Sequence, residues 1–84
     1  MIEDLSFVLR GKIRTQIITS LTNQKNPQRI AKEINTHLST TSRALTDLES
    51  KGLVKCLNPK DAFMRFYELT EKGKEIKAEI KKVI

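Results

Sequence analysis

Hydrogen-bonding side chains gather in one short stretch of this sequence, residues 39–50, where hydroxyl groups surround a single arginine, Arg43. The apolar residues of the stretch recur at helical spacing, which predicts a helix whose other side carries the hydroxyls and the guanidinium. Hydroxyls donate and accept hydrogen bonds, and a guanidinium donates two in parallel to paired acceptors. A helix surface with these groups can hydrogen-bond to the base edges and phosphates of nucleic acid. It does not bring together the acid, base and nucleophile of a catalytic site.

The charge balance of the chain points to the same kind of partner. The 84 residues include 16 lysines and arginines against 10 aspartates and glutamates, for a net charge of +6. Such an excess predicts a polyanionic partner, most often nucleic acid. With 38% hydrophobic and 31% charged residues, the composition is that of a folded domain rather than a disordered chain, and the length allows one domain, residues 1–84.

Other classes of site are disfavoured by what the sequence lacks. Cys56 is the only cysteine and His37 the only histidine, so one chain assembles neither a disulfide nor a structural zinc site. We therefore expect no cofactor and no enzyme activity. No run approaches the roughly 20 apolar residues that cross a bilayer, and we expect a cytoplasmic protein with no membrane partner.

Two helices are predicted before residue 22. Apolar residues recur at helical spacing in residues 2–9 and again in 13–21, and Gly11 separates the two patterns. Two shorter helices follow, joined by a tight turn. The first begins with Asn26-Pro27 and closes at Asn35; the second begins with Ser39 as its cap and stops at Gly52.

The last third of the chain changes from extended to helical periodicity. Residues 53–57 and 65–69 alternate as strands do, with a loop of about seven residues between them. Thr70 then caps a final helix that runs through Ile84. The element order is that of a winged helix-turn-helix: an α+β fold, mostly α, with a two-stranded β-hairpin wing and flanking N- and C-terminal helices.

Two segments carry a specific resemblance. The run Ser39-Thr40-Thr41-Ser42-Arg43-Ala44-Leu45, with Lys51-Gly52-Leu53-Val54 after it, resembles the recognition-helix signature of winged-helix regulators of the MarR and ArsR type. Leu69-Thr70-Glu71-Lys72-Gly73 resembles the segment after their wing. The similarity spans residues 7–73 and looks closest to short archaeal regulators, including Leu57-Asn58-Pro59-Lys60 at the start of the wing.

The resemblance implies a usually dimeric regulator that binds double-stranded DNA. Its third core helix, the one that begins with Ser39, lies in the major groove, and its wing lies on adjacent backbone or minor groove. Repression by promoter occlusion is the simplest mechanism. The alternative is a protein-docking module, because winged helices also serve in larger assemblies. A small-molecule effector is unknown from the sequence, and any such molecule would have to occupy a dimer seam or the gap beneath the wing.

The predicted DNA contacts come from three elements. Arg43 is expected to contact a guanine, and Ser39 is a helix cap before it is a DNA contact. Gln28, Arg29 and Lys32, on the helix that begins with Asn26-Pro27, are as well explained by a solvated basic surface as by phosphate contacts. The full set comprises Gln28, Arg29, Lys32, Ser39, Thr40, Ser42, Arg43, Thr46, Lys55, Lys60 and Arg65.

Apolar residues beyond the needs of a winged core suggest a second interface. The terminal segments, residues 1–10 and 70–84, are expected to form a homodimer through Ile2, Leu5, Leu9, Ile76, Ile80 and Ile84. Pairing of the two terminal helices within one chain is the alternative. Phe63 and Met64 are expected to fold back onto the hairpin, although a partner interface or a wedge against DNA is also open to them.

Overall fold

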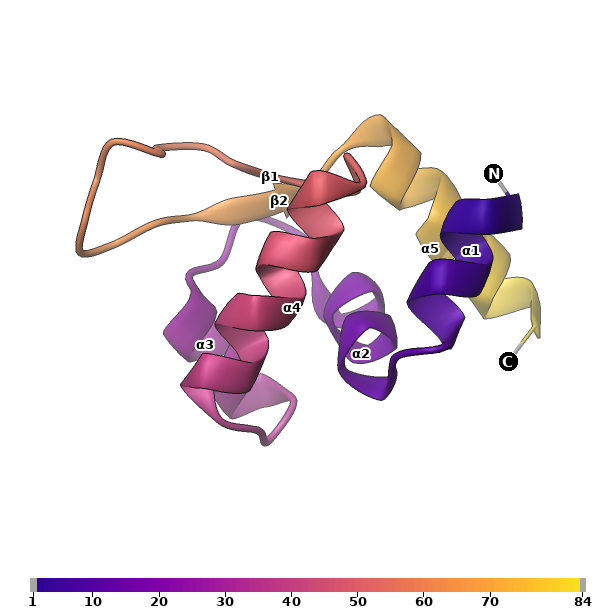
Figure 1. The fold of residues 1–84 in the computed structure, drawn as a ribbon, viewed down its shortest axis with the longest axis horizontal. Coiled ribbons are helices and arrows are strands. Elements are labelled where there is room, and N and C mark those ends of the chain that lie inside the picture. Colours follow the sequence, from indigo (N-terminus) through magenta and orange to yellow (C-terminus); the bar gives the residue numbers. More distant parts are fainter. Residues whose placement is uncertain (1, 84) are drawn as a thin grey trace.

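The computed structural model describes residues 2–83, and its elements follow the order that the sequence predicts (Figure 1). The fold is a winged helix: helices and a two-stranded antiparallel hairpin, with the wing at one end of the molecule and both termini at the other. Within this part of the chain the elements are α1 (Ile2–Leu9), α2 (Lys12–Ser20), α3 (Pro27–Glu33), α4 (Leu38–Ser50), β1 (Val54–Cys56), β2 (Tyr67–Leu69) and α5 (Glu71–Val83).

The core fills the space between α2 and the helices around it. Ile17 and Ile18 of α2, Leu48 of α4 and Ile76 of α5 are all fully buried. Burying each such side chain contributes roughly 1.5 to 3 kcal/mol, so the core holds these three helices in fixed positions. The inner side of α4 is the predicted one, namely Thr41, Ala44, Leu45 and Leu48.

The turns around α3 and α4 form largely as predicted. The Asn26 side chain accepts a hydrogen bond from the backbone N–H of Arg29 at 2.8 Å, which caps α3. Asn35 takes the left-handed conformation with φ 56°, and Gly52 ends α4 with φ 73°. The predicted cap at Ser39 is wrong, because α4 already begins at Leu38 and Ser39 lies inside its first turn.

The hairpin is shorter in its strands and longer in its loop than predicted. Val54 pairs with Leu69 and Cys56 with Tyr67, and residues 57–66 connect the strands. A backbone bridge that the sequence did not indicate joins Lys25 to Tyr67 through bonds of 3.0 and 2.9 Å. The connection between α2 and α3 is thereby fastened along the free edge of β2.

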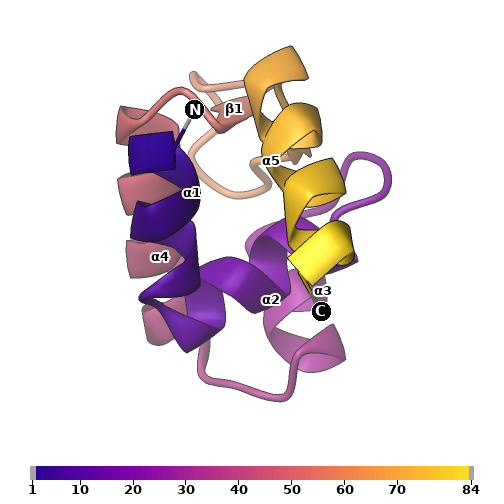
Figure 2. The ribbon, with the colours of Figure 1, turned by 90° about the vertical axis from the view of Figure 1, so that its right-hand side faces the viewer.

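Helices α1 and α5 lie side by side at the end opposite the wing (Figures 1 and 2). Asp4 of α1 and Lys72 of α5 form an ion pair of 2.9 Å that joins them. The predicted interface role of Ile76 and Ile80 is wrong, because both side chains are fully buried within one chain. Ile2 and Leu9 remain exposed, Leu5 is half-buried, and Ile84 lies outside the described residues.

None of the helices in residues 2–83 has the length and apolar character that crossing a membrane requires.

Candidate nucleic-acid interface

The outer side of α4 presents the polar residues that the sequence singles out. Ser39, Ser42, Arg43 and Thr46 are exposed, whereas Thr40 is half-buried. The Thr46 hydroxyl donates back to the Ser42 carbonyl at 3.0 Å, so it is left as an acceptor. Because the inner side of α4 is held in the core, this outer side is fixed in orientation toward solvent.

Arg43 projects from that side without a carboxylate partner among residues 2–83. Its five N–H donors are therefore free for an acceptor outside the chain. The guanidinium is neither buried in the protomer nor packed beneath another element, as a role at the surface requires.

A groove of about 430 Å³ lies between α4 and the wing, where the sequence anticipated a gap. Its walls bring together Gln28 from the start of α3, Ser42 and Thr46 from α4, and Phe63 and Arg65 from the wing. Predicted contact residues of all three elements thus line a single concavity.

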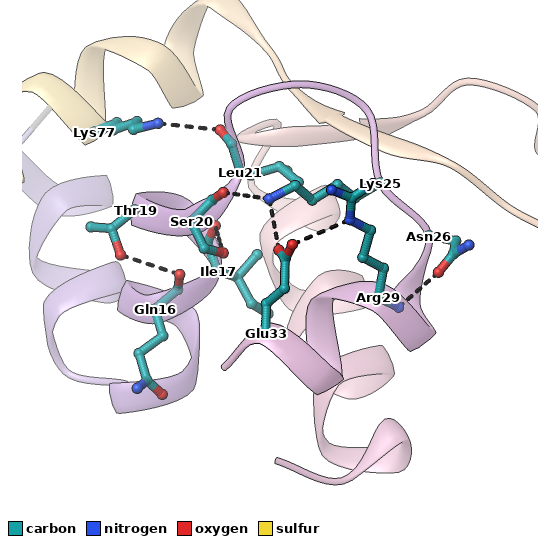
Figure 3. Close-up of polar contacts among 10 residues, drawn as sticks. All are labelled: Gln16, Ile17, Thr19, Ser20, Leu21, Lys25, Asn26, Arg29, Glu33 and Lys77. Carbon is teal, nitrogen blue, oxygen red and sulfur yellow. Dashed lines mark hydrogen bonds and ion pairs between the residues drawn. The ribbon is translucent and has the colours of Figure 1, made fainter. Parts of the chain in front are cut away.

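The basic residues of α3 are not equally available (Figure 3). Glu33 accepts from Lys25 Nζ at 2.7 Å and from Arg29 Nε at 3.2 Å, and Lys25 also donates to the Ser20 carbonyl at 2.9 Å. These donors, Lys25 first and Arg29 second, lower the pKa of Glu33. Arg29 is therefore partly neutralised, while Lys32 forms no ion pair among the described residues.

Lys25 is a structural residue that sequence reasoning missed. It is only 7% exposed although it lies in a polar run, Thr22 to Lys25, that indicates an ordinary surface loop. Its backbone bridges to Tyr67 and its ammonium bonds to Glu33, so it joins the hairpin edge to α3. The only sequence signal is Glu33 itself, a carboxylate eight positions away, and that spacing is not diagnostic.

The basic residues of the wing also differ in whether a carboxylate is already paired with them. Lys55 is paired across the hairpin with Glu68 at 3.4 Å, which reduces its positive charge toward a ligand. Lys60 is exposed, and it has no carboxylate partner within the described part of the chain. Arg65 Nε donates to the Asp61 carbonyl at 3.1 Å, and this bond orients an otherwise exposed guanidinium.

No cluster of three or more histidine, cysteine, aspartate and glutamate side chains within residues 2–83 is arranged to hold a metal ion.

Comparison with known proteins gives a family match over nearly the whole chain. The family model described as the N-terminal domain of the methanogenesis regulatory protein FilR1 matches residues 2–84. No curated protein matches the chain.

Solved structures with the same fold include DNA-binding proteins. The homodimeric winged helix-turn-helix DNA-binding domain of a possible ArsR-family regulator from Mycobacterium bovis is 24% identical, with TM-score 0.79, and the match covers 98% of this chain and 76% of that one. Reduced HlyU from Vibrio cholerae is 27% identical with TM-score 0.76, covering 96% and 82%. A MarR mutant from E. coli complexed with operator DNA is 26% identical with TM-score 0.77; the match covers 95% of this chain and 59% of the MarR chain.

Proposed function

Because the chain belongs to the family of the FilR1 N-terminal domain, we propose that it binds double-stranded DNA sequence-specifically and represses transcription by occupying an operator. The family and the similar structures are transcriptional regulators, not enzymes, and the chain is a winged-helix domain of that class. The cytoplasm is the expected location.

One observation supports this proposal most directly: Ser42 and Thr46 of α4 line the same groove as Phe63 and Arg65 of the wing. Arg43 is exposed on the same helix, beside a second hollow that α4 shares with the start of α2. With α4 in a major groove about 12 Å wide, Arg43 reaches guanine O6 and N7, and Ser42 and Thr46 reach neighbouring edges. Gln28 and Lys32 of α3 and the wing cations Lys60 and Arg65 then face the flanking phosphates.

We further propose a homodimer that binds two half-sites about 34 Å apart. The outer side of α1 is the part of the predicted interface that stays available, since Ile2 is 81% and Leu9 40% exposed. Val83, near the end of α5, is 66% exposed at the same end of the molecule. Exposed apolar side chains of this kind favour association with a second copy.

Selection of bound sequences from a random duplex pool tests the proposal. A sequence-specific dimer enriches a palindrome with a fixed half-site spacing, and a monomer enriches one short half-site. Sedimentation of the free protein, with Ile2→Glu and Leu9→Glu as interface variants, tests the dimer separately. No enrichment of any sequence would refute the proposed function and favour a protein-docking role.

A further inference from the structure

Phe63 is the most exposed large apolar side chain among the described residues, with 92% of its surface accessible. The prediction that it folds back onto the hairpin is therefore wrong. Met64 is also exposed, at 45%, and its sulfur accepts a hydrogen bond from the Asn26 side chain at 3.2 Å. Phe63 is therefore the more available of the two for an external partner.

Hydrogen bonds hold the loop in a shape that keeps Phe63 outward. The Asp61 carboxylate accepts from the backbone N–H groups of Phe63 at 2.8 Å and Met64 at 2.9 Å. Asn58 donates to the Met64 carbonyl at 2.7 Å and accepts from the Phe66 N–H at 2.8 Å. A loop bonded in this way is preorganised, so little conformational entropy is lost when Phe63 meets a ligand.

The charges around Phe63 indicate what that ligand is. Lys60 and Arg65 are exposed on either side of it in the sequence. Asp61 is the one acidic residue of the loop 57–66, and its carboxylate is turned onto backbone N–H groups, Met64 first, which lower its pKa. An aromatic side chain between free cations matches base faces lined by phosphates better than it matches an apolar protein surface.

The position of Phe63 relative to α4 selects the groove of the duplex. Phe63 lines the same concavity as Ser42 and Thr46 of α4, but from the wing side. If α4 occupies the major groove, the tip of the wing meets the adjacent strand and its minor groove. We propose that Phe63 enters the minor groove and wedges against a base step, an inference that rests on the proposed DNA-binding function.

Such a wedge adds sequence selectivity without a hydrogen bond to a base. Apolar side chains inserted from the minor groove partly unstack a step and kink the duplex. Pyrimidine–purine steps unstack most easily, so Phe63 favours TA or CA/TG at the contacted position. The preference arises from the deformability of the DNA rather than from readout of base edges.

The test uses the selected duplex with 2-aminopurine, a fluorescent adenine analogue, placed at each candidate step under the wing. We expect the protein to raise fluorescence at one step and Phe63→Ala to abolish that rise while lowering affinity about five- to hundredfold. The slope of affinity against salt stays unchanged, because Phe63→Ala removes no charge. Phe63→Leu retains a wedge and much of the signal.

Lys60→Ala is the matched comparison, since it alters the same loop through charge. It lowers affinity uniformly across sequences and reduces the magnitude of the salt slope by about 1 per protomer. The inference would be overturned if Phe63→Ala binds the duplex with the affinity and fluorescence of the wild type. It would also be overturned if Phe63→Ala shifts the monomer–dimer equilibrium in the absence of DNA, because Phe63 would then belong to a contact between copies.

Failure of the Phe63 wedge can be distinguished from failure of DNA binding itself. If Arg43→Ala and Lys60→Ala weaken binding while Phe63→Ala does not, only the wedge is refuted. If the wild-type protein binds no duplex, the proposed function itself is refuted, and the wedge falls with it.

Discussion

Arg43 is the residue on which the proposed sequence selectivity depends most. It is exposed on the outer side of α4 and has no carboxylate partner among residues 2–83, whereas Arg29 is held by Glu33. Glu33 takes one N–H donor of Arg29 and offsets part of its charge, whereas Arg43 keeps all its donors and its full charge. The two arginines therefore differ in expected role, Arg43 for base contacts and Arg29 for the stability of α3.

Replacing Arg43 tests this role. Arg43→Ala should cost about 1 to 3 kcal/mol of binding free energy on the selected duplex and relax preference at one base pair. Arg43→Lys keeps the charge without the paired donors, so it should retain the salt slope but lose the base preference. Binding isotherms on the selected duplex and on single-base variants measure both effects, and an undiminished preference in Arg43→Ala would assign specificity elsewhere.

At the scale of the elements, the start of α5 is set by a close backbone approach. Gly73 in the first turn of α5 faces the backbone carbonyl of Leu53, and a Cβ at this position would overlap that oxygen. The same carbonyl accepts from Thr70 N at 3.1 Å, and the Thr70 hydroxyl caps α5 through Gly73 N at 3.0 Å. The contact fixes α5 against the base of the wing.

We expect Gly73→Ala to destabilise the fold by about 1 to 3 kcal/mol despite the helical propensity of alanine, because backbone must shift to admit the methyl group. Gly11→Ala is the matched control. There the nearest atoms to a Cβ belong to the Arg14 side chain rather than to backbone, so Arg14 can shift, at the cost of its stacking on Phe7 at 4.1 Å. Urea unfolding of both variants checks the difference, and equal stability of the two would contradict the proposed backbone overlap.

Much of this architecture follows from periodicity and turn residues. The inner side of α4, the Asn26 cap, the left-handed Asn35 and Gly52, and the order of elements are local properties that spacing reveals. The family resemblance of residues 39–54 adds the expected surface, because it implies which helix would face a duplex.

Apart from the Ser39 cap and the strand bounds, the errors concern contacts that no periodic pattern marks. Ile76 and Ile80 lie on an apolar side that suits either an interface or a core, and only the folded chain shows that its own helices bury them. The exposure of Phe63 depends on hydrogen bonds that the Asp61 carboxylate accepts from the backbone, and the burial of Lys25 depends on Glu33 and Tyr67. None of these partners is marked by a repeating pattern, so periodicity could not predict them.

For the whole molecule, stability should fall in acid. Lys72, by its hydrogen bond, lowers the pKa of Asp4 below its ordinary 3.8, and the pKa values of Glu33 and Asp61 are lowered too. A carboxyl whose pKa is lower in the folded than in the unfolded protein stabilises the fold when the pH is above its unfolded-state pKa. This stabilisation is lost as the pH falls through the folded-state pKa. Unfolding free energy should therefore decline below about pH 4.

Asp4→Asn isolates one of these contributions, the pair that joins α1 to α5. It should lower the free energy of unfolding at pH 7, and the difference from wild type should shrink toward pH 2 as Asp4 itself becomes protonated. Glu79→Gln, which removes a surface pair with Lys82 of 3.5 Å within α5, should have little effect at either pH. Denaturant titrations over this range measure both, and a pH-independent deficit in Asp4→Asn would show that the charge is not the cause.

The distribution of paired and free cations over the molecule sets the salt dependence of DNA binding. Glu33 neutralises Arg29, and Glu68 neutralises Lys55, so two of the predicted phosphate contacts are already occupied. The cations on the proposed surface that form no ion pair among residues 2–83 are Lys32, Arg43, Lys60 and Arg65.

Because Arg43 is assigned to a base, three of these cations per protomer face phosphate, and a dimer should show a slope of log affinity against log salt of about −5, a monomer a slope of about −3. Glu68→Gln frees Lys55 for phosphate and should steepen the dimer slope by up to about 2 while tightening binding at low salt.

Glu79→Gln makes the same change in net charge by freeing Lys82 on α5, away from the wing. If affinity responds only to net charge, the two variants will behave alike; if Lys55 contacts the backbone, only Glu68→Gln will steepen the slope. Fluorescence anisotropy titrations across a salt series separate these outcomes, and a slope near zero in the wild type would exclude phosphate contacts altogether.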